Sequence, residues 1–259
     1  MGELTAAAGE RAARASAQAD ALREAVTAVP PGPDFAAALR GDAVAVIAEL
    51  KRRSPSKGAL NESIDAAGRA VAYVRGGARA LSILTEPVRF GGALDDLRSA
   101  RASVPVPLLR KDFLVASVQL LEARAHGASA VLLIARALPP AHVRDLALEA
   151  VALGLTPLIE VRSTAELGTA LDVPQAVIGV NNRDLETLVI DPAVGTRLIP
   201  MVPPDRVAVY ESGVQSAADV EMAAAAGADA VLVGSVLSLA SDPVATVTAL
   251  AGVPRRARA

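Results

Sequence analysis

The chain has 259 residues, of which 52% are hydrophobic and 2% are aromatic, and it contains no Cys and no Trp. A single α/β barrel takes about 250 residues, and Val, Leu, Ile and Ala are abundant enough here to fill its core. The formal net charge of −2 excludes the basic footprint of a nucleic-acid-binding protein. The lack of Cys excludes disulfides, a thiolate nucleophile and Cys-based metal sites.

The N-terminal segment, residues 3–28, is rich in Ala and in charged residues, which predicts one exposed helix ended by the prolines at positions 30, 31 and 33. Its acidic residues do not fit a secretory or organelle-targeting peptide. Further along, residues 222–240 are almost uncharged, but Asp229 in their middle favours a helix, a turn and a buried strand over a membrane span. We therefore expect a cytoplasmic protein that does not bind membranes.

From residue 44 onward, short apolar runs alternate with helix-like segments. This alternation predicts right-handed βαβ units and a parallel sheet. Gly77, Gly127 and Gly227 each end a predicted helix just before a strand, so the pattern also repeats. The eight predicted strands are residues 44–50, 80–85, 107–111, 130–134, 156–161, 176–181, 207–211 and 230–234. The eight predicted helices are residues 64–76, 93–102, 117–126, 139–153, 163–171, 191–201, 216–226 and 243–251.

The turn after the first strand helps to choose between an open and a closed parallel sheet. An open doubly wound sheet usually carries a Gly-rich dinucleotide-binding turn there, whereas residues 51–58 read Lys-Arg-Arg-Ser-Pro-Ser-Lys-Gly. The sequence therefore predicts an α/β protein with a single (β/α)8 TIM barrel over residues 35–259. An N-terminal helical extension, residues 1–34, precedes this catalytic domain.

Charged side chains gather at the predicted C-terminal ends of the strands, where barrels of this class carry their active sites. Glu49 and Lys51 are two residues apart, so both side chains point toward the barrel mouth and can set each other's charge state. Lys111 and Glu160 form a second acid–base set, and Glu211 ends the seventh strand. Any one of these charges could belong to a structural ion pair, but together they predict a catalytic cluster.

The last two strands end in Ser212-Gly213 and Gly234-Ser235. Glycine lets backbone N–H groups approach an anion, and the loops after strands 7 and 8 form the usual phosphate site of barrel enzymes. Arg53, in the first loop, could add a positive charge to the same anion. Ordinary turn chemistry also uses Gly and Ser, but two such turns on adjacent strands favour phosphate binding.

The two histidines stand apart in the sequence. His126 lies at the end of a predicted helix and His142 lies within the next one. The structural interpretation, a cation at a helix end and a surface position, is favoured over a catalytic role for either. We predict no metal site.

Several segments of this sequence strongly resemble the indole-3-glycerol-phosphate synthase family. The resemblance spans about residues 35–250 in one continuous order, and its first and sixth segments are the most specific. The segments are residues 47–58, 81–86, 90–92, 110–113, 157–160, 178–185, 211–213 and 233–235. The resemblance implies a carboxy-lyase of tryptophan biosynthesis. Its substrate would be 1-(2-carboxyphenylamino)-1-deoxyribulose 5-phosphate, which undergoes ring closure, decarboxylation and dehydration without a cofactor.

The resemblance also implies roles for the strand-end residues. Lys111 would be the general acid that protonates the ketone, and Lys51 would hold the substrate carboxylate or act as the acid in dehydration. Glu160 and Glu49 would stabilise the charge that develops on nitrogen and take up a proton. The orienting residues would be Asn181 and Glu211, and Arg183 would help to close the site. The phosphate-binding residues would be Arg53, Ser54, Ser212, Gly213, Gly234 and Ser235.

An apolar pocket would surround the aryl ring while CO2 leaves, since decarboxylation is favoured where water is excluded. The alternative is that these side chains simply fill the core, and for Leu132 this alternative has at least equal weight. The candidates are Phe90, Phe113, Leu132, Leu185 and Leu188.

Two features depart from the family pattern. Tyr210 stands where the family usually has a small residue, which is harmless only if its side chain points outward. The absence of Trp removes a ring-stacking residue that some members bring from the N-terminal segment.

Three other functions remain as alternatives. Phosphoribosylanthranilate isomerase, a related barrel, usually needs a Cys base that this chain lacks. The second is an aldolase-type enzyme that forms a Schiff base on Lys111. The third is a catalytically silent barrel that binds a sugar phosphate. The expected partner is a small phosphorylated molecule, and the oligomeric state stays open, with a monomer acceptable.

Overall fold

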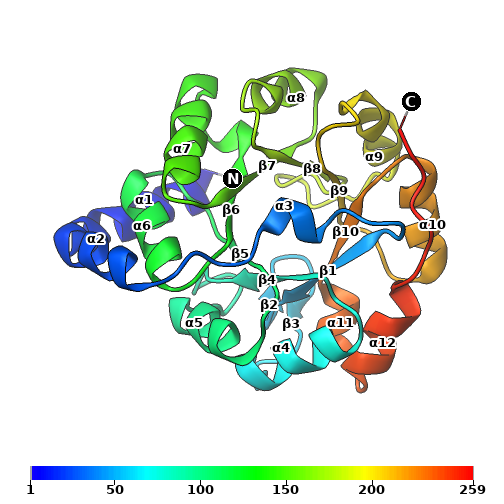
Figure 1. Cartoon of the computed structure of the whole chain (residues 1–259), viewed down its shortest axis with the longest axis horizontal. Helices are drawn as coiled ribbons and strands as arrows, with labels where there is room; N and C mark the ends of the chain where they lie inside the picture. The colour runs from blue at the N-terminus through cyan, green and yellow to red at the C-terminus, as the bar shows by residue number, and fades with distance from the viewer. Residues whose placement is uncertain (1, 259) are drawn as a thin grey trace.

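A closed barrel of eight parallel strands forms the centre of the molecule, as the computed structural model, which describes residues 2–258, shows (Figure 1). Going round the barrel, the strand order is β1-β10-β9-β8-β7-β6-β5-β4, and β1 closes the ring by pairing with β4. Each predicted strand is confirmed to within one residue at either end. The strands are β1 (Ala45–Leu50), β4 (Ala80–Leu84), β5 (Leu108–Lys111), β6 (Ala130–Ile134), β7 (Thr156–Val161), β8 (Val177–Asn181), β9 (Ala208–Glu211) and β10 (Ala230–Val233).

A ring of helices surrounds the strands, and the eight predicted helices are all present. The ring consists of α4 (Ala66–Arg75), α5 (Leu94–Ser103), α6 (Ser117–Ala125), α7 (Pro140–Ala152), α8 (Thr164–Leu171), α9 (Ala193–Leu198), α10 (Ala217–Ala225) and α12 (Pro243–Leu250). Helix α9 is shorter than predicted, because the chain tightens into a 3-10 turn, η2 (Ile199–Met201), around Pro200.

Some short elements in the loops of the barrel were not predicted. A two-stranded hairpin, β2 (Arg53–Ser54) and β3 (Gly58–Ala59), follows β1, and a short helix, α11 (Ser235–Leu239), follows β10. A 3-10 turn, η1 (Ala135–Ala137), follows β6. All three lie in loops at the C-terminal end of the barrel. They could not be predicted, because an element of two to five residues is too short to show a hydrophobic periodicity.

Side chains along each strand alternate between the barrel interior and the helix layer. On β1, Ala45 and Ile47 belong to the inner cluster, whereas Val46, Ala48 and Leu50 pack under the helices. The next inward positions after Ile47 are residues 49 and 51. The alternation therefore delivers Glu49 and Lys51 to the mouth of the barrel, as expected.

The N-terminal segment differs from the prediction of one exposed helix. It forms two helices, α1 (Gly2–Ser16) and α2 (Ala19–Ala28), and both pack against α6. Ala8, Ala12 and Ala15 on α1 are buried. The chain bends at residues 17–18, and this bend lets both helices stay in contact with α6, where Leu22 packs beside Ala15.

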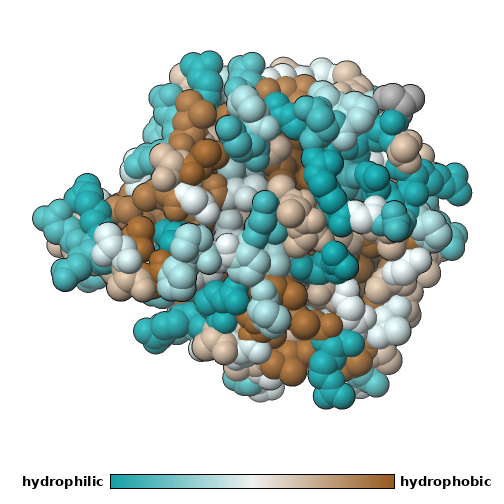
Figure 2. All heavy atoms as spheres, in the orientation of Figure 1, coloured by the Kyte–Doolittle hydropathy of each residue, from teal (hydrophilic) through white to brown (hydrophobic). Residues whose placement is uncertain are grey.

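The opposite end of the barrel is closed by a short helix, α3 (Phe35–Ala38), which lies across the centre of Figure 1. Phe35 and Leu39 are fully buried and belong to the inner cluster. In the same view, Figure 2 shows hydrophilic side chains over the projecting tip of the N-terminal helices. Within residues 2–258, no helix is both long and apolar enough to cross a membrane, since residues 222–240 contain the end of α10, all of β10 and α11.

Candidate active site

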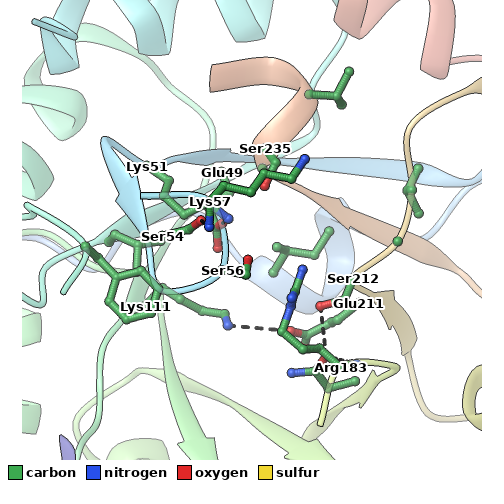
Figure 3. A pocket seen from close by; sticks show the side chains of 18 of the residues that line it. Glu49, Lys51, Ser54, Ser56, Lys57, Lys111, Arg183, Glu211, Ser212 and Ser235 are labelled. Atoms are coloured by element: carbon green, nitrogen blue, oxygen red, sulfur yellow. Dashed lines mark hydrogen bonds and ion pairs between the residues drawn. The ribbon is translucent and has the colours of Figure 1, made fainter. Parts of the chain in front are cut away.

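A cavity of about 700 Å³ opens at the C-terminal ends of the strands (Figure 3). Its floor carries the charged residues Glu49, Lys51, Lys111, Glu160 and Glu211. The five come from β1, β5, β7 and β9 or from the residue just after a strand. The fold therefore brings together the charged side chains that the sequence predicted as a cluster.

The first pair lies at the end of β1, with Glu49 in the strand and Lys51 just after it. Lys51 Nζ donates to Glu49 Oε1 at 2.7 Å, and both side chains are almost buried. Burial by itself raises the pKa of Glu49, but the nearby charges of Lys51 and Lys111 outweigh it and hold that pKa below its usual value. A Cβ at Gly234 would overlap Glu49 Oε1 and lie 2.8 Å from Lys51 Nζ. Glycine at this position thus makes room for the pair.

The second cluster centres on Lys111, whose Nζ lies 3.4 Å from Glu160 Oε2 and 3.6 Å from Glu211 Oε2 (Figure 3). Burial by itself lowers the pKa of Lys111. The carboxylates of Glu160, Glu211 and Glu49 outweigh it and raise that pKa above its usual value. The ammonium is therefore kept charged although most of the side chain is buried. This is the state that a general acid requires before it gives up a proton.

Glu211 behaves differently from its neighbours. Burial raises its pKa to about 8, Lys111 opposes this shift, and Glu160 and Glu49 add to it. Its Oε1 is buried without a hydrogen-bond partner among the described residues. A Cβ at Gly179 on β8 would overlap that oxygen, so glycine is needed there for the carboxyl group to fit.

Most of the residues predicted for the anion line the cavity. Ser212 has a left-handed backbone with φ of 67°, and its Oγ donates to Asn181 Oδ1 at 2.9 Å. The backbone N–H of Arg183 donates to the same oxygen at 2.9 Å. The cavity-lining residues include Arg183, Ser212, Gly213, Gly234 and Ser235, as predicted.

Arg53 is placed elsewhere. It is half exposed, its guanidinium pairs with Glu62, and it does not line the cavity. Its neighbour Ser54 does line the cavity and is buried, and its Oγ accepts a hydrogen bond from the backbone N–H of Lys57. The cation that the β1 loop brings to the cavity is Lys57. It lies in the segment of residues 47–58, so its place in the motif was the signal for it.

Apolar side chains form the rest of the cavity wall. The predicted residues Phe90, Phe113, Leu132, Leu185 and Leu188 all line it. Sequence reasoning missed Leu4, which reaches the same wall from α1, far from the barrel in sequence. Nothing in the local pattern around Leu4 signals this contact, because it depends on how α1 docks on the barrel.

An ion pair holds helix α1 against the barrel beside the cavity. Arg11 donates to Asp112 Oδ1 at 2.7 Å, and Arg110 and Thr85 bind the other oxygen of the same carboxylate. Asp112 is almost fully buried and directly follows Lys111. The N-terminal segment is therefore tied to the strand end that carries Lys111.

Three residues singled out in the sequence lie outside the cavity. Tyr210 points outward, is buried in the helix layer and belongs to the outer cluster, which is the harmless orientation. His142 is exposed, and His126 Nδ1 pairs with the backbone oxygen of Glu122 at the end of α6. Both histidines thus occupy the structural positions that were favoured for them.

The barrel is similar to those of several enzymes of known structure, and at these identities the similarity shows the fold alone. One is a 3-hexulose-6-phosphate synthase from Salmonella typhimurium, with a TM-score of 0.64 and 14% identity, which covers 80% of this chain and 96% of that one. Another is a thiamine phosphate pyrophosphorylase from Pyrococcus furiosus, with a TM-score of 0.59 and 15% identity, which covers 80% of this chain and 93% of that one.

Sequence comparison is more specific. The family model for indole-3-glycerol phosphate synthase matches residues 4–250. Indole-3-glycerol phosphate synthase 1 of Streptomyces coelicolor is 50% identical, over 93% of this chain and 89% of the relative. The indole-3-glycerol phosphate synthase of Mycolicibacterium smegmatis is 48% identical, over 89% of this chain and 85% of the relative. The matched range, the identity and the coverage all confirm the resemblance found in the motifs: the chain belongs to the indole-3-glycerol phosphate synthase family.

Proposed function

We propose that this chain closes, decarboxylates and dehydrates 1-(2-carboxyphenylamino)-1-deoxyribulose 5-phosphate, and that the strand-end cluster carries the chemistry. One observation carries this proposal: the Lys111 ammonium, on a side chain that is only 16% exposed, stands between Glu160 and Glu211 on the floor of a cavity with an apolar wall. A proton donor, proton acceptors and an apolar surface for an aryl ring are the groups that this reaction needs.

Ring closure begins when the aryl carbon that bears the carboxylate attacks the ketone carbon. Lys111 protonates the ketone oxygen as the new C–C bond forms, so the oxygen becomes a hydroxyl. The C–C bond to the carboxylate then breaks, CO2 leaves, and its electron pair restores the aromatic ring. Because Glu160 lies 3.4 Å from Lys111, it can help to reprotonate the lysine and stabilise charge on the substrate nitrogen.

Dehydration completes the product. The hydroxyl leaves as water with a proton from a lysine, and a carboxylate takes the proton whose loss makes the new ring aromatic. The 2.7 Å pair of Lys51 and Glu49 provides an acid and a base on one strand for these transfers. Lys51 can hold the substrate carboxylate before that step.

The phosphate would lie against the turns after β9 and β10. Ser212, Gly213, Gly234 and Ser235 offer hydroxyl and backbone N–H donors there, and Arg183 lines the same cavity. Lys57 adds a positive charge from the β1 loop. For Arg53 to join them, its guanidinium would have to leave Glu62.

The division of the chain is part of the same proposal. We take residues 1–34 as a helical extension, whose α1 contributes Leu4 to the cavity, and residues 35–259 as the catalytic domain. The cytoplasmic location stays a prediction.

The test is turnover of the carboxyphenylamino-deoxyribulose phosphate, followed by indoleglycerol-phosphate fluorescence and by CO2 release. We expect turnover by the parent and a loss of at least about 100-fold in kcat for Lys111→Ala, the usual effect of removing a general acid. A folded parent that binds the substrate without releasing CO2 would be a binding protein and would overturn the proposal. An active Lys111→Ala would refute the role of this lysine.

A further inference from the structure

Asn182 lies beside the site but has no role in the function proposed above. It follows the cavity-lining Asn181 at the end of β8. Adjacent residues on a strand point to opposite faces, so Asn181 faces the cavity and Asn182 faces the helix layer. Asn182 is completely buried and does not line the cavity. A buried amide carries two donors and an acceptor that must all be satisfied, so its partners indicate what it does.

The backbone oxygen of Asn182 accepts from the backbone N–H of Asp191 at 2.9 Å, and its other hydrogen bonds join it to the turn after β9 and to α9. Its Nδ2 donates to the backbone oxygens of Glu211 at 2.8 Å and Ser212 at 3.2 Å. Its backbone N–H donates to the same Glu211 oxygen at 3.0 Å. Its Oδ1 accepts from the backbone N–H of Gly195 on α9 at 2.8 Å. One residue thus makes three hydrogen bonds to the turn that follows β9.

That turn has an unusual backbone. Ser212 has φ of 67° and the next residue, Gly213, has φ of 96°. A left-handed conformation is unfavourable for serine and persists only where the surroundings hold it in place. The Asn182 amide holds the turn from outside the barrel. On the inside, Ser212 Oγ donates to Asn181 Oδ1.

The outer side of Asn182 is tightly packed. A Cβ at Gly195 would lie 2.8 Å from Asn182 Oδ1 and would overlap the ring of Tyr210. Both Gly195 and Tyr210 are buried. The amide therefore cannot swing away from the turn without disturbing α9.

We propose that Asn182 is a positioning residue that locks the Glu211–Ser212–Gly213 turn in its left-handed conformation. It thereby aims the Glu211 carboxyl group at Lys111 and the donors of Ser212 and Gly213 at the phosphate group of the substrate. This assignment rests on the function proposed above. Its ligand class is a phosphate monoester, and inorganic phosphate is the probe for it.

The test is Asn182→Ala, which removes the side-chain hydrogen bonds to the backbone oxygens of Glu211 and Ser212 and leaves the Gly195 N–H without its acceptor. We expect the dissociation constant for inorganic phosphate, from ³¹P NMR titration, and the KM for substrate to rise about tenfold each, with a lower kcat because Glu211 also moves. Arg258→Ala is the control for instability alone. Arg258 donates hydrogen bonds to Asp229 and to the backbone oxygen of Val202 at the opposite end of the barrel. Its loss should therefore leave the dissociation constant for phosphate and the KM unchanged.

A second variant tests the backbone mechanism. Glycine adopts positive φ readily, so Asn182→Ala should lower the phosphate affinity less in a Ser212→Gly background than in the parent, although Ser212→Gly by itself removes one hydroxyl donor. A folded Asn182→Ala protein whose phosphate affinity and KM stay within twofold of the parent would overturn the assignment. So would an equal loss in Arg258→Ala. A parent without turnover would refute the proposed function instead, and the phosphate titration would still decide the role of Asn182.

Discussion

At the scale of single residues, the site contains ionised side chains that burial by itself would tend to neutralise. Lys111 remains charged because three carboxyl groups surround it, and Glu49 remains ionised because two lysines lie nearby. Each charge is therefore stable only in the presence of the others. Removing any one of them changes the protonation of its neighbours as well as its own contribution.

The raised pKa of Glu211, about 8, gives a prediction for pH dependence. Below that pH the carboxyl group is neutral. Above it, a further negative charge beside Lys111 makes the lysine a weaker acid, so kcat should fall as the pH rises through about 8. In Glu211→Gln, which stays neutral, this limb of the profile should disappear, whatever the absolute rate. If kcat of the variant still falls near pH 8, this fall must come from the titration of another group.

The same shift predicts how stability changes with pH. A carboxyl group whose pKa is 4.5 when unfolded and about 8 when folded binds more protons in the folded state between these values. Its contribution to stability is therefore full below pH 4.5 and declines as the pH rises through 8. Urea denaturation at pH 6 and pH 8 should show a smaller decline for Glu211→Gln than for the parent.

Gly179 gives a steric prediction. A Cβ there would overlap Glu211 Oε1 and lie 2.8 Å from Leu158 Cδ2, so Gly179→Ala should displace the carboxyl group. We expect kcat to fall at least about tenfold and stability to fall by about 1–3 kcal/mol, the usual cost of overpacking. Gly168→Ala is the matched control, because a Cβ at Gly168 in α8 meets no atom within 4 Å. Equal activity in both variants would show that Glu211 has room to move.

At the scale of secondary structure elements, α1 is the clearest addition to the barrel. Glu3 pairs with Arg89 in the loop after β4, and Arg11 pairs with Asp112 after β5. Leu4, on the same helix, lines the cavity. Although α1 lies outside the barrel, it forms part of the wall beside Phe113 and borders the strand end that carries Lys111.

We predict that Arg11→Ala loosens this wall. The nearly buried Asp112 would lose its 2.7 Å partner, and kcat/KM should fall about tenfold, which corresponds to about 1.4 kcal/mol. Arg23→Ala is the control on the neighbouring helix α2, where Arg23 forms an exposed pair with Asp20 and should have no effect on activity. Steady-state kinetics on both variants decide this. A loss of equal size in both would mean that α1 acts only through the general docking of the N-terminal segment.

At the scale of the whole molecule, the two ends of the barrel have different tasks. The C-terminal end of the strands carries the cavity. The other end is closed by α3 and by residues 255–258, where Arg255 and Arg258 both bind the fully buried Asp229. This division between a functional end and a stabilising end is usual for the fold.

Arg258→Ala should therefore change stability without changing catalysis. Its guanidinium is almost completely buried and bonds to Asp229 at 2.8 Å, so its removal leaves a buried carboxylate with one partner fewer. The expected loss is about 3 kcal/mol, or on the order of 10 °C in Tm, at unchanged KM. The exposed Arg256, two residues earlier, is the control, and Arg256→Ala should leave Tm unchanged. A changed KM in Arg258→Ala would contradict the separation of the two ends.

The sequence by itself determined the barrel and most of the cavity. The alternation of apolar strands with helices fixed eight βα units, and the two-residue period put Glu49 and Lys51 on the same face of β1. In a parallel barrel all strand ends meet at one mouth, so residues far apart in the chain, such as Lys111 and Glu160, could be predicted to lie together.

Only the tertiary structure decided what depends on packing between distant segments. The bend between α1 and α2 arises from contacts with α6. The local sequence at residues 17–18 does not predict it. The sequence put Arg53 near the anion, but the hairpin after β1 turns it toward Glu62 and brings Lys57 to the cavity instead. The division between Asn181, which faces the cavity, and Asn182, which holds the turn from behind, depends on the exact end of β8. Local periodicity reports which face a residue takes, whereas these outcomes follow from which neighbour it meets there, and that is set by the folded chain as a whole.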